Sequence, residues 1–357
     1  MISCDSWTDE AKPSFAETRT IEAMKAIVYQ KSGSATVLKL AEIEKPVPKD
    51  DQVLIKLRAA SVNPFDYHLL KHTFLRRVVG KGGTAQPGRD MAGEVEAIGP
   101  GVAQLQPGDE VFGASAGAFA EYTCAPASEV AIKPPRISFE QAAAIPIAGL
   151  TALQGLRDKG QLQPGQKVLI NGASGGVGTF AVQIAKWLGA EVTGVCSTRN
   201  VDLVRSLGAD HVVDYTRENL TSTGRKYDLF FDLVANQSFA ARRGLLTAKG
   251  MYIGAGLLGK PLSVGLLAGG IAELLKAAFV SQKFSSFVAK LNREDLATIA
   301  ALIEEGSVTP VIDKRYSLSE TPEAVNYVEQ KHARGKVIID LDRSPSLQPQ
   351  ATLRGEN

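Results

Sequence analysis

The chain has 357 residues, of which 44% are hydrophobic and 22% are charged, and its formal net charge is +2. The length allows two domains, the composition is that of a soluble globular protein, and the absence of a long basic run argues against a nucleic-acid-binding surface. The three cysteines, Cys4, Cys124 and Cys196, are far apart and form no Cys-x-x-Cys pair, which indicates a reducing compartment: we expect the cytoplasm, with an organelle as the alternative.

The two ends of the chain lack the pattern of a folded element. Residues 1–23 are polar and mixed in charge, without the apolar core of a signal peptide or the acid-poor character of a transit peptide. Residues 343–357 are polar and show no period. We therefore expect a disordered extension before Met24 and a disordered tail after residue 342.

The first part of the chain reads as short strands separated by proline and glycine. The expected strands cover residues 25–29, 52–60, 92–98, 110–112 and 118–124. Pro-Gly turns at Pro107-Gly108 and Pro164-Gly165 stand between apolar runs. Regular short strands with such turns predict a β-barrel or sandwich.

The pattern changes near Phe139, where helical spacing begins and continues to Leu156, interrupted at Pro146. Beyond it we expect strands over residues 167–171, 191–196, 211–214, 227–234 and 250–254, and helices over 177–188, 201–207 and 238–246. Further helices are expected over 292–305 and 322–330, and a final strand over 336–341. The alternation of strand and helix predicts an α/β domain with a doubly wound parallel sheet.

A glycine-rich turn between the first strand and first helix of this alternation is the strongest local signal. The run Val168-Leu169-Ile170-Asn171-Gly172-Ala173-Ser174-Gly175-Gly176-Val177-Gly178 leads from a β-rich segment into a helical one. Glycines let the backbone turn tightly and approach a diphosphate, which the N–H groups and the positive dipole end of the helix attract. Residues 171–178, called the glycine turn below, therefore predict a dinucleotide site rather than an ordinary strand–helix connection.

The end of the next strand indicates which nicotinamide cofactor binds. NAD sites carry an acidic residue about 20 residues beyond the glycines, and none stands there. Ser197 can donate to a 2′-phosphate, Arg199 can pair with it, and Tyr215 can close the pocket. Asp202 lies one helical step further on and is expected to point elsewhere. The pattern favours NADP(H) over NAD(H); the alternative is that Arg199 is a solvated charge and Tyr215 packs at an edge.

Residues 256–280 are apolar and rich in glycine and leucine. A membrane span is disfavoured because Gly259-Lys260-Pro261, Glu273 and Lys276 interrupt the stretch of ~20 apolar residues that a span requires. We expect a buried helix, or one that lines a substrate pocket or a subunit contact.

Several further motifs make the chain resemble a known enzyme family. They are Ala60-Ser61-Val62-Asn63-Pro64-Phe65-Asp66, Pro87-Gly88-Arg89-Asp90-Met91-Ala92-Gly93-Glu94-Val95, Gln106-Pro107-Gly108-Asp109-Glu110-Val111, Ala148-Gly149-Leu150-Thr151-Ala152, Leu207-Gly208-Ala209-Asp210 and Ala333-Arg334-Gly335-Lys336-Val337. With the glycine turn, they resemble the medium-chain dehydrogenase/reductase superfamily, and within it the zinc-free quinone oxidoreductase branch, including the chloroplast-envelope homologues. The resemblance implies a GroES-like catalytic domain (residues 24–146 and 288–342) split around a Rossmann NADP-binding domain (residues 147–287).

The residues at the family's zinc positions separate two chemistries. Zinc alcohol dehydrogenases of this superfamily carry a cysteine near the position of Asn63 and a Gly-His-Glu where this chain has Gly88-Arg89-Asp90. Neither arginine nor asparagine suits a zinc ion, which takes thiolate or imidazole ligands, so we expect no metal. His68 and His72 stand at helical spacing, but no third soft ligand is near in sequence.

The same resemblance implies a set of site residues. Asn63 would line the nicotinamide end of the cleft, where its amide can bond the cofactor ribose or an acceptor oxygen, and Tyr67 and His68 could donate to the carbonyl or simply pack. Expected cofactor contacts are Thr151, Ser174, Gly175, Gly176, Val177, Gly178, Leu233, Val234, Gly254, Ala255, His332, Ala333 and Arg334, in addition to Ser197, Arg199 and Tyr215.

Without zinc no Lewis acid polarises a simple ketone, and hydride transfer to a conjugated acceptor is the easier reaction. The leading hypothesis is an NADPH-dependent reductase of a small-molecule quinone or α,β-unsaturated carbonyl. The alternatives are a zinc-type secondary-alcohol dehydrogenase and a non-catalytic NADPH-binding protein. Family members are often dimers joined through the Rossmann sheet, so the resemblance also implies a homodimer.

Overall fold

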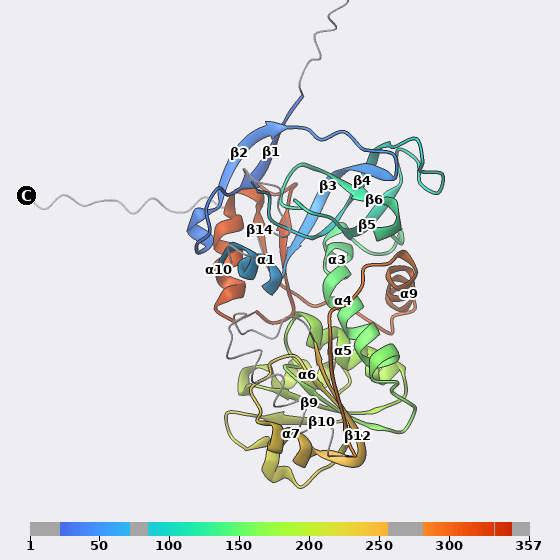
Figure 1. The fold of residues 1–357 in the computed structure, drawn as a ribbon, viewed down its shortest axis with the longest axis vertical. Coiled ribbons are helices and arrows are strands. Elements are labelled where there is room, and N and C mark those ends of the chain that lie inside the picture. Colours follow the sequence, from blue (N-terminus) through green and yellow to red (C-terminus); the bar gives the residue numbers. More distant parts are fainter. Residues whose placement is uncertain (1–21, 72–84, 256–280, 332, 345–357) are drawn as a thin grey trace, which may run out of the picture.

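The computed structural model describes residues 22–71, 85–255, 281–331 and 333–344. The expected extension and tail fall largely outside these residues, as do the apolar stretch 256–280 and the two residues His72 and His332. The described chain forms two parts joined by helices (Figure 1). One contains the first and the last elements of the described chain, and the other contains the middle elements.

The terminal part is rich in strands, as expected. Its elements are β1 (Ala23–Val28), β2 (Lys39–Glu44), β3 (Gln52–Val62), α1 (Pro64–Lys71), β4 (Asp90–Ile98), β5 (Glu110–Ala114), β6 (Tyr122–Pro126), β7 (Val130–Ile132), β14 (Ile312–Ser317), α10 (Thr321–Glu329) and β15 (Lys336–Asp340). The pair β1–β2 is antiparallel, and the larger sheet has the order β14-β15-β3-β4-β5-β7 with β6 also paired to β3. The final strand β15 therefore returns to the first domain and lies beside β3.

One expected strand, over residues 118–124, forms only in its last part, β6. Gly117 has φ +85° and turns the chain just before it. Residues 118–120 instead follow β1, where Phe119 accepts a hydrogen bond from the Ile27 N–H (2.8 Å) and Ala120 bridges Ala26. The prediction was wrong there because a turn, which the apolar run hides, redirects the backbone.

The middle part is a parallel sheet covered by helices. Its elements are β8 (Lys167–Asn171), α5 (Gly176–Trp187), β9 (Glu191–Cys196), α6 (Val201–Ser206), β10 (His211–Asp214), β11 (Tyr227–Asp232), α7 (Phe239–Leu245), β12 (Leu246–Ala255) and β13 (Lys283–Phe287). The order β10-β9-β8-β11-β12-β13 is parallel throughout. From β8 the chain adds β9 and β10 on one side of the sheet, and then crosses to add β11, β12 and β13 on the other side. Ligands bind such sheets at the carboxyl ends of the strands, beside the point where the order reverses. The glycine turn follows β8 and lies there.

Helices connect the two parts. The helical pattern from Phe139 divides into α3 (Phe139–Ala143) and α4 (Pro146–Leu153), because Pro146 cannot continue α3 but is suited to a first helical turn. A π-helical turn, Gln154–Lys159, extends α4. Short 3-10 turns at Ala35–Val37, Ala127–Glu129, Thr198–Asn200, Leu220–Thr223 and Leu318–Glu320 complete the structure together with α9 (Arg293–Glu304).

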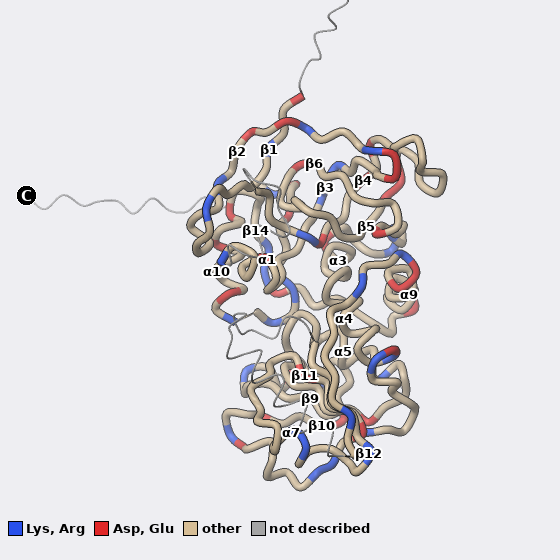
Figure 2. Tube along the Cα trace, in the orientation of Figure 1, with Lys and Arg blue, Asp and Glu red and all other residues tan. Residues whose placement is uncertain are grey.

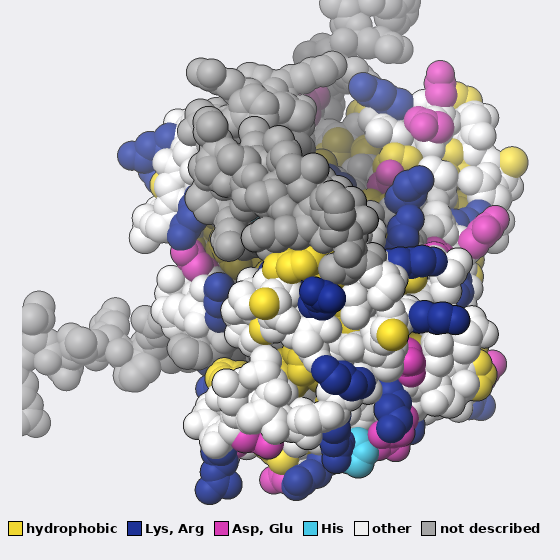
Figure 3. Space-filling view, turned by 60° about the horizontal axis from the view of Figure 1, so that its bottom comes forward, with side chains coloured by type: hydrophobic (Ala, Val, Ile, Leu, Met, Phe, Trp, Pro, Cys, Tyr) yellow, Lys and Arg dark blue, Asp and Glu magenta, His cyan; other side chains and the backbone are white. Residues whose placement is uncertain are grey.

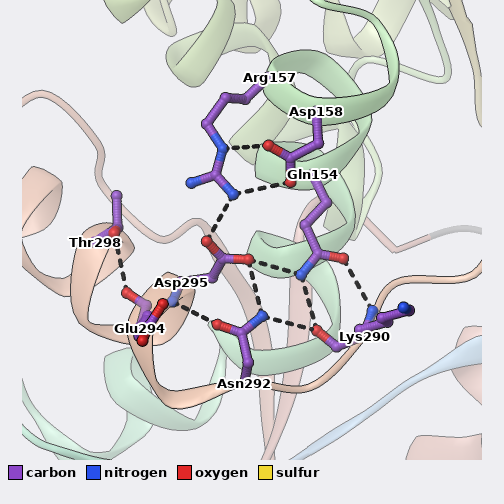
Figure 4. A network of polar contacts seen from close by, with 8 residues as sticks. All are labelled: Gln154, Arg157, Asp158, Lys290, Asn292, Glu294, Asp295 and Thr298. Atoms are coloured by element: carbon purple, nitrogen blue, oxygen red, sulfur yellow. Dashed lines mark hydrogen bonds and ion pairs between the residues drawn. The ribbon is translucent and has the colours of Figure 1, made fainter.

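A polar network fixes the return of the chain from the middle part (Figure 4). The Asp295 carboxylate on α9 accepts hydrogen bonds from Arg157 (2.7 Å), Gln154 (2.8 Å) and Asn292 (2.9 Å). Gln154 also exchanges hydrogen bonds with the backbone of Lys290, at 2.8 and 2.9 Å. Burial raises the pKa of Asp295, but these hydrogen bonds outweigh it and hold the pKa below its usual value. The segment before α9 is thereby tied to the π-helical turn.

The two parts share one apolar core. The largest cluster of buried side chains includes Ala59, Ala92 and Phe112 of the terminal part with Val168, Ile170 and Phe180 of the middle part. Charged residues of both signs are interspersed over both parts (Figure 2). Continuous packing of this kind holds the two parts in one relative position.

Candidate active site

The first residues of β15 lie against the glycine turn. The N–H of Gly335 donates to the carbonyl oxygen of Ser174 (3.0 Å), and Gly175 and Gly335 form a parallel bridge. The start of β15 thus meets the start of α5, where the two parts of the molecule join (Figure 1).

The glycine turn leaves open space at Gly175 and brings the backbone close to itself at Gly178. A Cβ on Gly178 would lie 2.1 Å from the Gly172 carbonyl oxygen, so only glycine fits there. A Cβ on Gly175, the residue before α5, would meet only that oxygen at 3.5 Å, and no side chain caps the helix. The open approach and the helix N-terminus are suited to an anion. The contacts of Ser174, Gly176 and Val177 with a diphosphate stay predictions.

Asn200 is a residue of this site that the sequence reasoning missed. Its Nδ2 donates to the hydroxyls of Ser174 (3.0 Å) and Ser197 (3.2 Å), so it joins the glycine turn to the end of β9. The side chain is 5% exposed, and among the described residues no hydrogen-bond donor reaches its buried Oδ1. A buried acceptor without a donor is costly, so the position of Asn200 is maintained by its two Nδ2 bonds. The only signal in the sequence was its position next to Arg199.

The residues expected at the adenosine end lie around Asn200. Arg199 is exposed on the short turn after Ser197, and Tyr215, after β10, is 62% exposed. The phenol of Tyr327 on α10 has its pKa raised to about 12 by burial and by the Asp313 carboxylate, and the charge of Arg199 opposes the rise. The side chain of Asp202 is fully exposed, as expected.

The carboxyl ends of β11 and β12 also reach this edge. The strand expected to end at Val234 ends at Asp232, because the Asp232 Oδ1 accepts hydrogen bonds from the backbone N–H groups of Val234 (3.0 Å) and Ala235 (2.9 Å) and turns the chain. Leu233 and Val234 therefore lie on a loop, and Val234 is 51% exposed. Gly254 pairs with Asp232 at the end of β12, with Ala255 next to it.

A buried cluster centred on Asp90 lies at the other end of the site. Its carboxylate, fully buried, accepts hydrogen bonds from the Ser61 hydroxyl (3.0 Å), Asn63 Nδ2 (2.9 Å), the Ile147 N–H (3.0 Å) and Lys336 Nζ (3.1 Å). These donors come from the end of β3, the start of α4 and the start of β15. Asp90 thereby fixes three segments that converge on the glycine turn.

Asn63 is the predicted site residue in this cluster, and its amide is almost fully engaged. Nδ2 donates to Asp90 and, at 3.4 Å, to the Ser61 carbonyl, while Oδ1 accepts from Lys336 Nζ (2.7 Å). Both donors are used, and the second lone pair of Oδ1 is the remaining capacity of the amide. Asn63 is thus suited to accept from a hydroxyl rather than to donate to an acceptor oxygen.

Thr151 connects to the same cluster through α4. It is 7% exposed, and its hydroxyl donates to the Ile147 carbonyl oxygen (2.7 Å), one turn earlier. The oxygen of Thr151 keeps its own lone pairs and can accept from a carboxamide N–H. This fits the contact implied by the resemblance.

The first turn of α1 carries the other predicted catalytic residues. Asp66, which is 1% exposed, accepts from the Asn63 N–H (2.7 Å), and burial raises its pKa to about 7. Tyr67 packs in the apolar core of the terminal part, where burial and the Glu329 carboxylate raise its pKa. The ring of His68, half-buried, lies 4.4 Å from that of Tyr67. The roles of Tyr67 and His68 stay predictions.

The segment before Gly335 is held from the other side. Asp313 accepts from the Arg334 N–H (2.9 Å) and the Tyr327 hydroxyl (2.8 Å), and Ala333 packs against the core. These bonds place Ala333 and Arg334 beside the glycine turn. The predicted contact of His332 lies outside the described residues.

Comparison with known proteins identifies this architecture. Residues 49–135 match the alcohol dehydrogenase GroES-like domain, and residues 207–339 match the zinc-binding dehydrogenase family. The chain is 34% identical over 339 residues to the chloroplastic NADPH-dependent alkenal/one oxidoreductase of Arabidopsis thaliana, covering 91% of this chain and 81% of that protein. The chain belongs to the medium-chain dehydrogenase/reductase family.

Other members of the family are similar over nearly their whole length. The chloroplast envelope quinone oxidoreductase homolog of Arabidopsis thaliana is 33% identical over 331 residues, which cover 89% of this chain and 98% of that protein. The solved structure of the quinone oxidoreductase from Coxiella burnetii superposes with a TM-score of 0.80 at 30% identity, covering 90% of this chain and 100% of that one. The predicted medium-chain dehydrogenase/reductase fold, with a GroES-like domain and a Rossmann domain, is confirmed.

At the family's zinc positions this chain places Asn63 and Arg89. The Asn63 amide is engaged as described above, and the Arg89 guanidinium, 5.8 Å from the centre of the Phe65 ring, is not a ligand for a cation. Within the described residues, no three His, Cys, Asp or Glu side chains are grouped so as to hold a metal ion. No helix in the same residues is long and apolar enough to cross a membrane.

Proposed function

We propose that this medium-chain dehydrogenase/reductase is an NADPH-dependent reductase that transfers hydride to a quinone or an α,β-unsaturated carbonyl without zinc. The observation that carries the proposal is the cluster of Asn63, Asp90 and Lys336 beside the glycine turn. At the family's zinc positions the chain has Asn63 and Arg89, whose amide and guanidinium groups are poor ligands for a zinc ion, and the cluster already engages the Asn63 amide. A conjugated acceptor needs no Lewis acid, because the negative charge that hydride addition creates is delocalised onto the carbonyl oxygen. A hydrogen-bond donor can stabilise that oxygen, and water can protonate the product.

The names of the relatives support the same substrate class. They include an NADPH-dependent alkenal/one oxidoreductase, a quinone oxidoreductase homolog and the 2-methylene-furan-3-one reductase of Solanum lycopersicum, 34% identical over 337 residues. All three names describe an oxidoreductase that acts on a conjugated carbonyl compound or a quinone. Two of these relatives are named as chloroplast proteins, and we propose the cytoplasm or an organelle as the compartment of this chain.

The preference for NADPH rests on the end of β9. Ser197, Arg199 and Asn200 offer hydroxyl, guanidinium and amide groups there, and Asp214, the carboxylate at the end of β10, is engaged by the hydroxyls of Thr198 (2.6 Å) and Thr216 (2.7 Å). Without a free acid, the site suits a 2′-phosphate better than a 2′-hydroxyl. Tyr215, exposed beside it, would close the phosphate pocket.

A bound nicotinamide supplies the hydride. The chain's own residues bind and orient: the glycine turn seats the diphosphate, Thr151 accepts from the carboxamide, and Asn63 accepts from a ribose hydroxyl through its remaining lone pair. Leu233, Val234, Gly254 and Ala255 would line the strand ends, and Ala333 and Arg334 would close the site from the other domain. Tyr67 and His68 are the candidate donors to the carbonyl of the acceptor.

We also propose a homodimer joined through β13. This strand pairs with β12 on one side, and no described strand pairs with its other side. Val288, directly after it, is 68% exposed. Many Lys and Arg side chains are exposed on one face of the molecule (Figure 3), and a hollow of about 410 Å³ is lined by residues that include Lys226, Phe239 and Arg243. That hollow lies at the amino ends of β11 and β12, away from the cofactor edge, so we do not assign it to the active site.

The test mixes purified protein with NADPH and a panel of enals, enones and quinones, and follows the loss of nicotinamide absorbance. We expect turnover with at least one conjugated acceptor, weaker turnover with NADH, and no zinc by elemental analysis. Stoichiometric zinc with oxidation of a secondary alcohol would favour the alcohol dehydrogenase instead. NADPH binding without reduction of any acceptor would favour the non-catalytic alternative.

A further inference from the structure

Lys336 is a buried cation at the junction of the two domains, and sequence reasoning gave it no role beyond opening the last strand. Its side chain is 3% exposed, and that of its partner Asp90 is fully buried. Removing a charged group from water is unfavourable, and the loss is recovered only where the charge is paired and its donors are used. Lys336 Nζ meets this condition through Asp90 (3.1 Å) and Asn63 Oδ1 (2.7 Å).

The stem of the same side chain touches the glycine turn. A Cβ on Gly176, the first residue of α5, would lie 3.1 Å from Lys336 Cδ. The preceding residue, Gly335, carries the backbone bond to Ser174. One residue therefore contacts the diphosphate seat with its stem and the Asn63 amide with its head.

The charges around Asn63 select one orientation of its amide. In the observed orientation, Oδ1 faces the Lys336 ammonium and Nδ2 faces the Asp90 carboxylate. Rotation of the amide by half a turn would bring its N–H₂ group against the ammonium and its oxygen against the carboxylate. Both contacts are repulsive, and in a buried site such repulsion is poorly screened.

We propose that Lys336 is a positioning residue: it fixes the Asn63 amide with its oxygen available as an acceptor, and so couples the seat of the diphosphate to the nicotinamide end of the site. The inference rests on the proposed role of Asn63 toward the cofactor. Lys336 acts through Asn63 in this scheme, and is not a catalytic residue.

The test is a double-mutant cycle of Lys336→Met and Asn63→Ala, read by fluorescence titration of NADPH in the absence of any acceptor. If Lys336 works through Asn63, each single substitution raises the NADPH dissociation constant about tenfold, and the double variant is no weaker than Asn63→Ala alone. Lys336→Arg, which keeps the charge, recovers part of the loss. The proposal would be overturned if the fold-change in the NADPH dissociation constant of the double variant equalled the product of the fold-changes of the two single variants. An unchanged dissociation constant in Lys336→Met would also overturn it.

A matched control separates positioning from loss of stability. Lys133 is also a buried lysine, 4% exposed, bonded to the Glu110 carboxylate (2.9 Å) and to the backbone carbonyls of Pro134 and Ile137, remote from the cluster in sequence and in fold. Lys133→Met is expected to lower the melting temperature and leave the NADPH dissociation constant unchanged. Equal weakening of NADPH binding in both variants would show that Lys336 matters only for folding.

The same experiments distinguish this inference from the proposed function. A wild-type chain that binds NADPH and reduces no acceptor would refute the reductase, and the double-mutant cycle would still decide the role of Lys336. A wild-type chain that binds no NADPH would overturn both.

Discussion

The backbone N–H of Gly335 donates a 3.0 Å hydrogen bond to the carbonyl oxygen of Ser174, and this bond joins the start of β15 in the GroES-like domain to the glycine turn of the Rossmann domain. The bond connects main-chain atoms only, so it depends on the path of the backbone at Gly335. That residue has φ +92°, and a Cβ on it would lie 2.3 Å from the Val311 carbonyl oxygen. The junction of the domains therefore requires glycine at this position.

Gly335→Ala should weaken both the fold and cofactor binding. The left-handed conformation alone costs an alanine ~1–2 kcal/mol, and the clash with Val311 adds to it and displaces the start of β15. We expect a lower melting temperature and an NADPH dissociation constant raised about tenfold or more. The measurements are thermal unfolding without cofactor and fluorescence titration.

Gly108→Ala is the matched control for that prediction. Gly108 has the same φ of +92°, but a Cβ on it would meet no atom within 4 Å. It should show the conformational cost alone and bind NADPH normally. Equal losses of stability in the two variants would contradict the argument that the close contact at Gly335 matters.

Gly175→Ala tests where the diphosphate lies. Gly175 has φ −83°, which alanine adopts freely, and its Cβ would have room in the protein without cofactor. The melting temperature should stay within about a degree of wild type, while the methyl group intrudes on the open seat and raises the NADPH dissociation constant at least about tenfold. Gly178→Ala, whose Cβ would lie 2.1 Å from the Gly172 oxygen, should instead lose stability as well. Normal NADPH affinity in Gly175→Ala would remove the glycine turn from the diphosphate site.

Local patterns predicted the parts of the site that are local in sequence. The glycine turn lies where its strand–turn–helix pattern placed it, and β8, β9 and β10 have the predicted bounds. The amphipathic helices were also found within a residue or two, because burial of one face fixes their period. The strands β13 and β14 were missed, since their sequences, Lys-Phe-Ser-Ser-Phe and Ile-Asp-Lys-Arg-Tyr-Ser, are polar enough to resemble loops.

The interactions between distant residues were beyond the reach of the sequence. Lys336 and Asn63 are 273 positions apart. No period or motif in the sequence relates Lys336, the first residue of β15, to Asn63, which directly follows β3. The sequence left open whether the Asn63 amide bonds the cofactor ribose or an acceptor oxygen, and only its partners show that its donors are already occupied. Asn200 was passed over for the neighbouring Arg199, whose charge suggests phosphate binding, whereas the importance of Asn200 comes from the two loops that it joins.

Arg199→Ala should shift the cofactor preference. A charge-assisted hydrogen bond to a phosphate contributes ~1.5–3 kcal/mol, so loss of the guanidinium should raise the NADPH dissociation constant about tenfold to a hundredfold. The NADH dissociation constant should change less than about twofold, because NADH has no phosphate at that position. Parallel titrations with the two cofactors measure the ratio.

Arg205→Ala serves as the control for that change. Arg205 is exposed on α6, beside the fully exposed Asp202. Its replacement by alanine removes the same charge as Arg199→Ala, but from a neighbouring part of the surface. Its loss should affect both cofactors alike and only weakly. A similar fall in NADPH affinity in both variants would mean that general surface charge, and not a specific pair with Arg199, attracts the cofactor.

Asp66 should make the stability of the protein depend on pH in an unusual direction. Burial raises its pKa from 3.8 to about 7, so between about pH 4 and pH 7 the folded protein holds a proton that the unfolded chain has lost. The free energy of unfolding therefore falls as the pH rises through this window, by at most ~1.4 kcal/mol per pH unit from this group, and changes little from it above about pH 7. Asp66→Asn keeps an oxygen to accept from the Asn63 N–H but cannot ionise. Thermal unfolding of both proteins from pH 5 to pH 8 should show the wild type losing melting temperature relative to the variant as the pH rises, whereas a constant difference would mean that Asp66 does not titrate in this range.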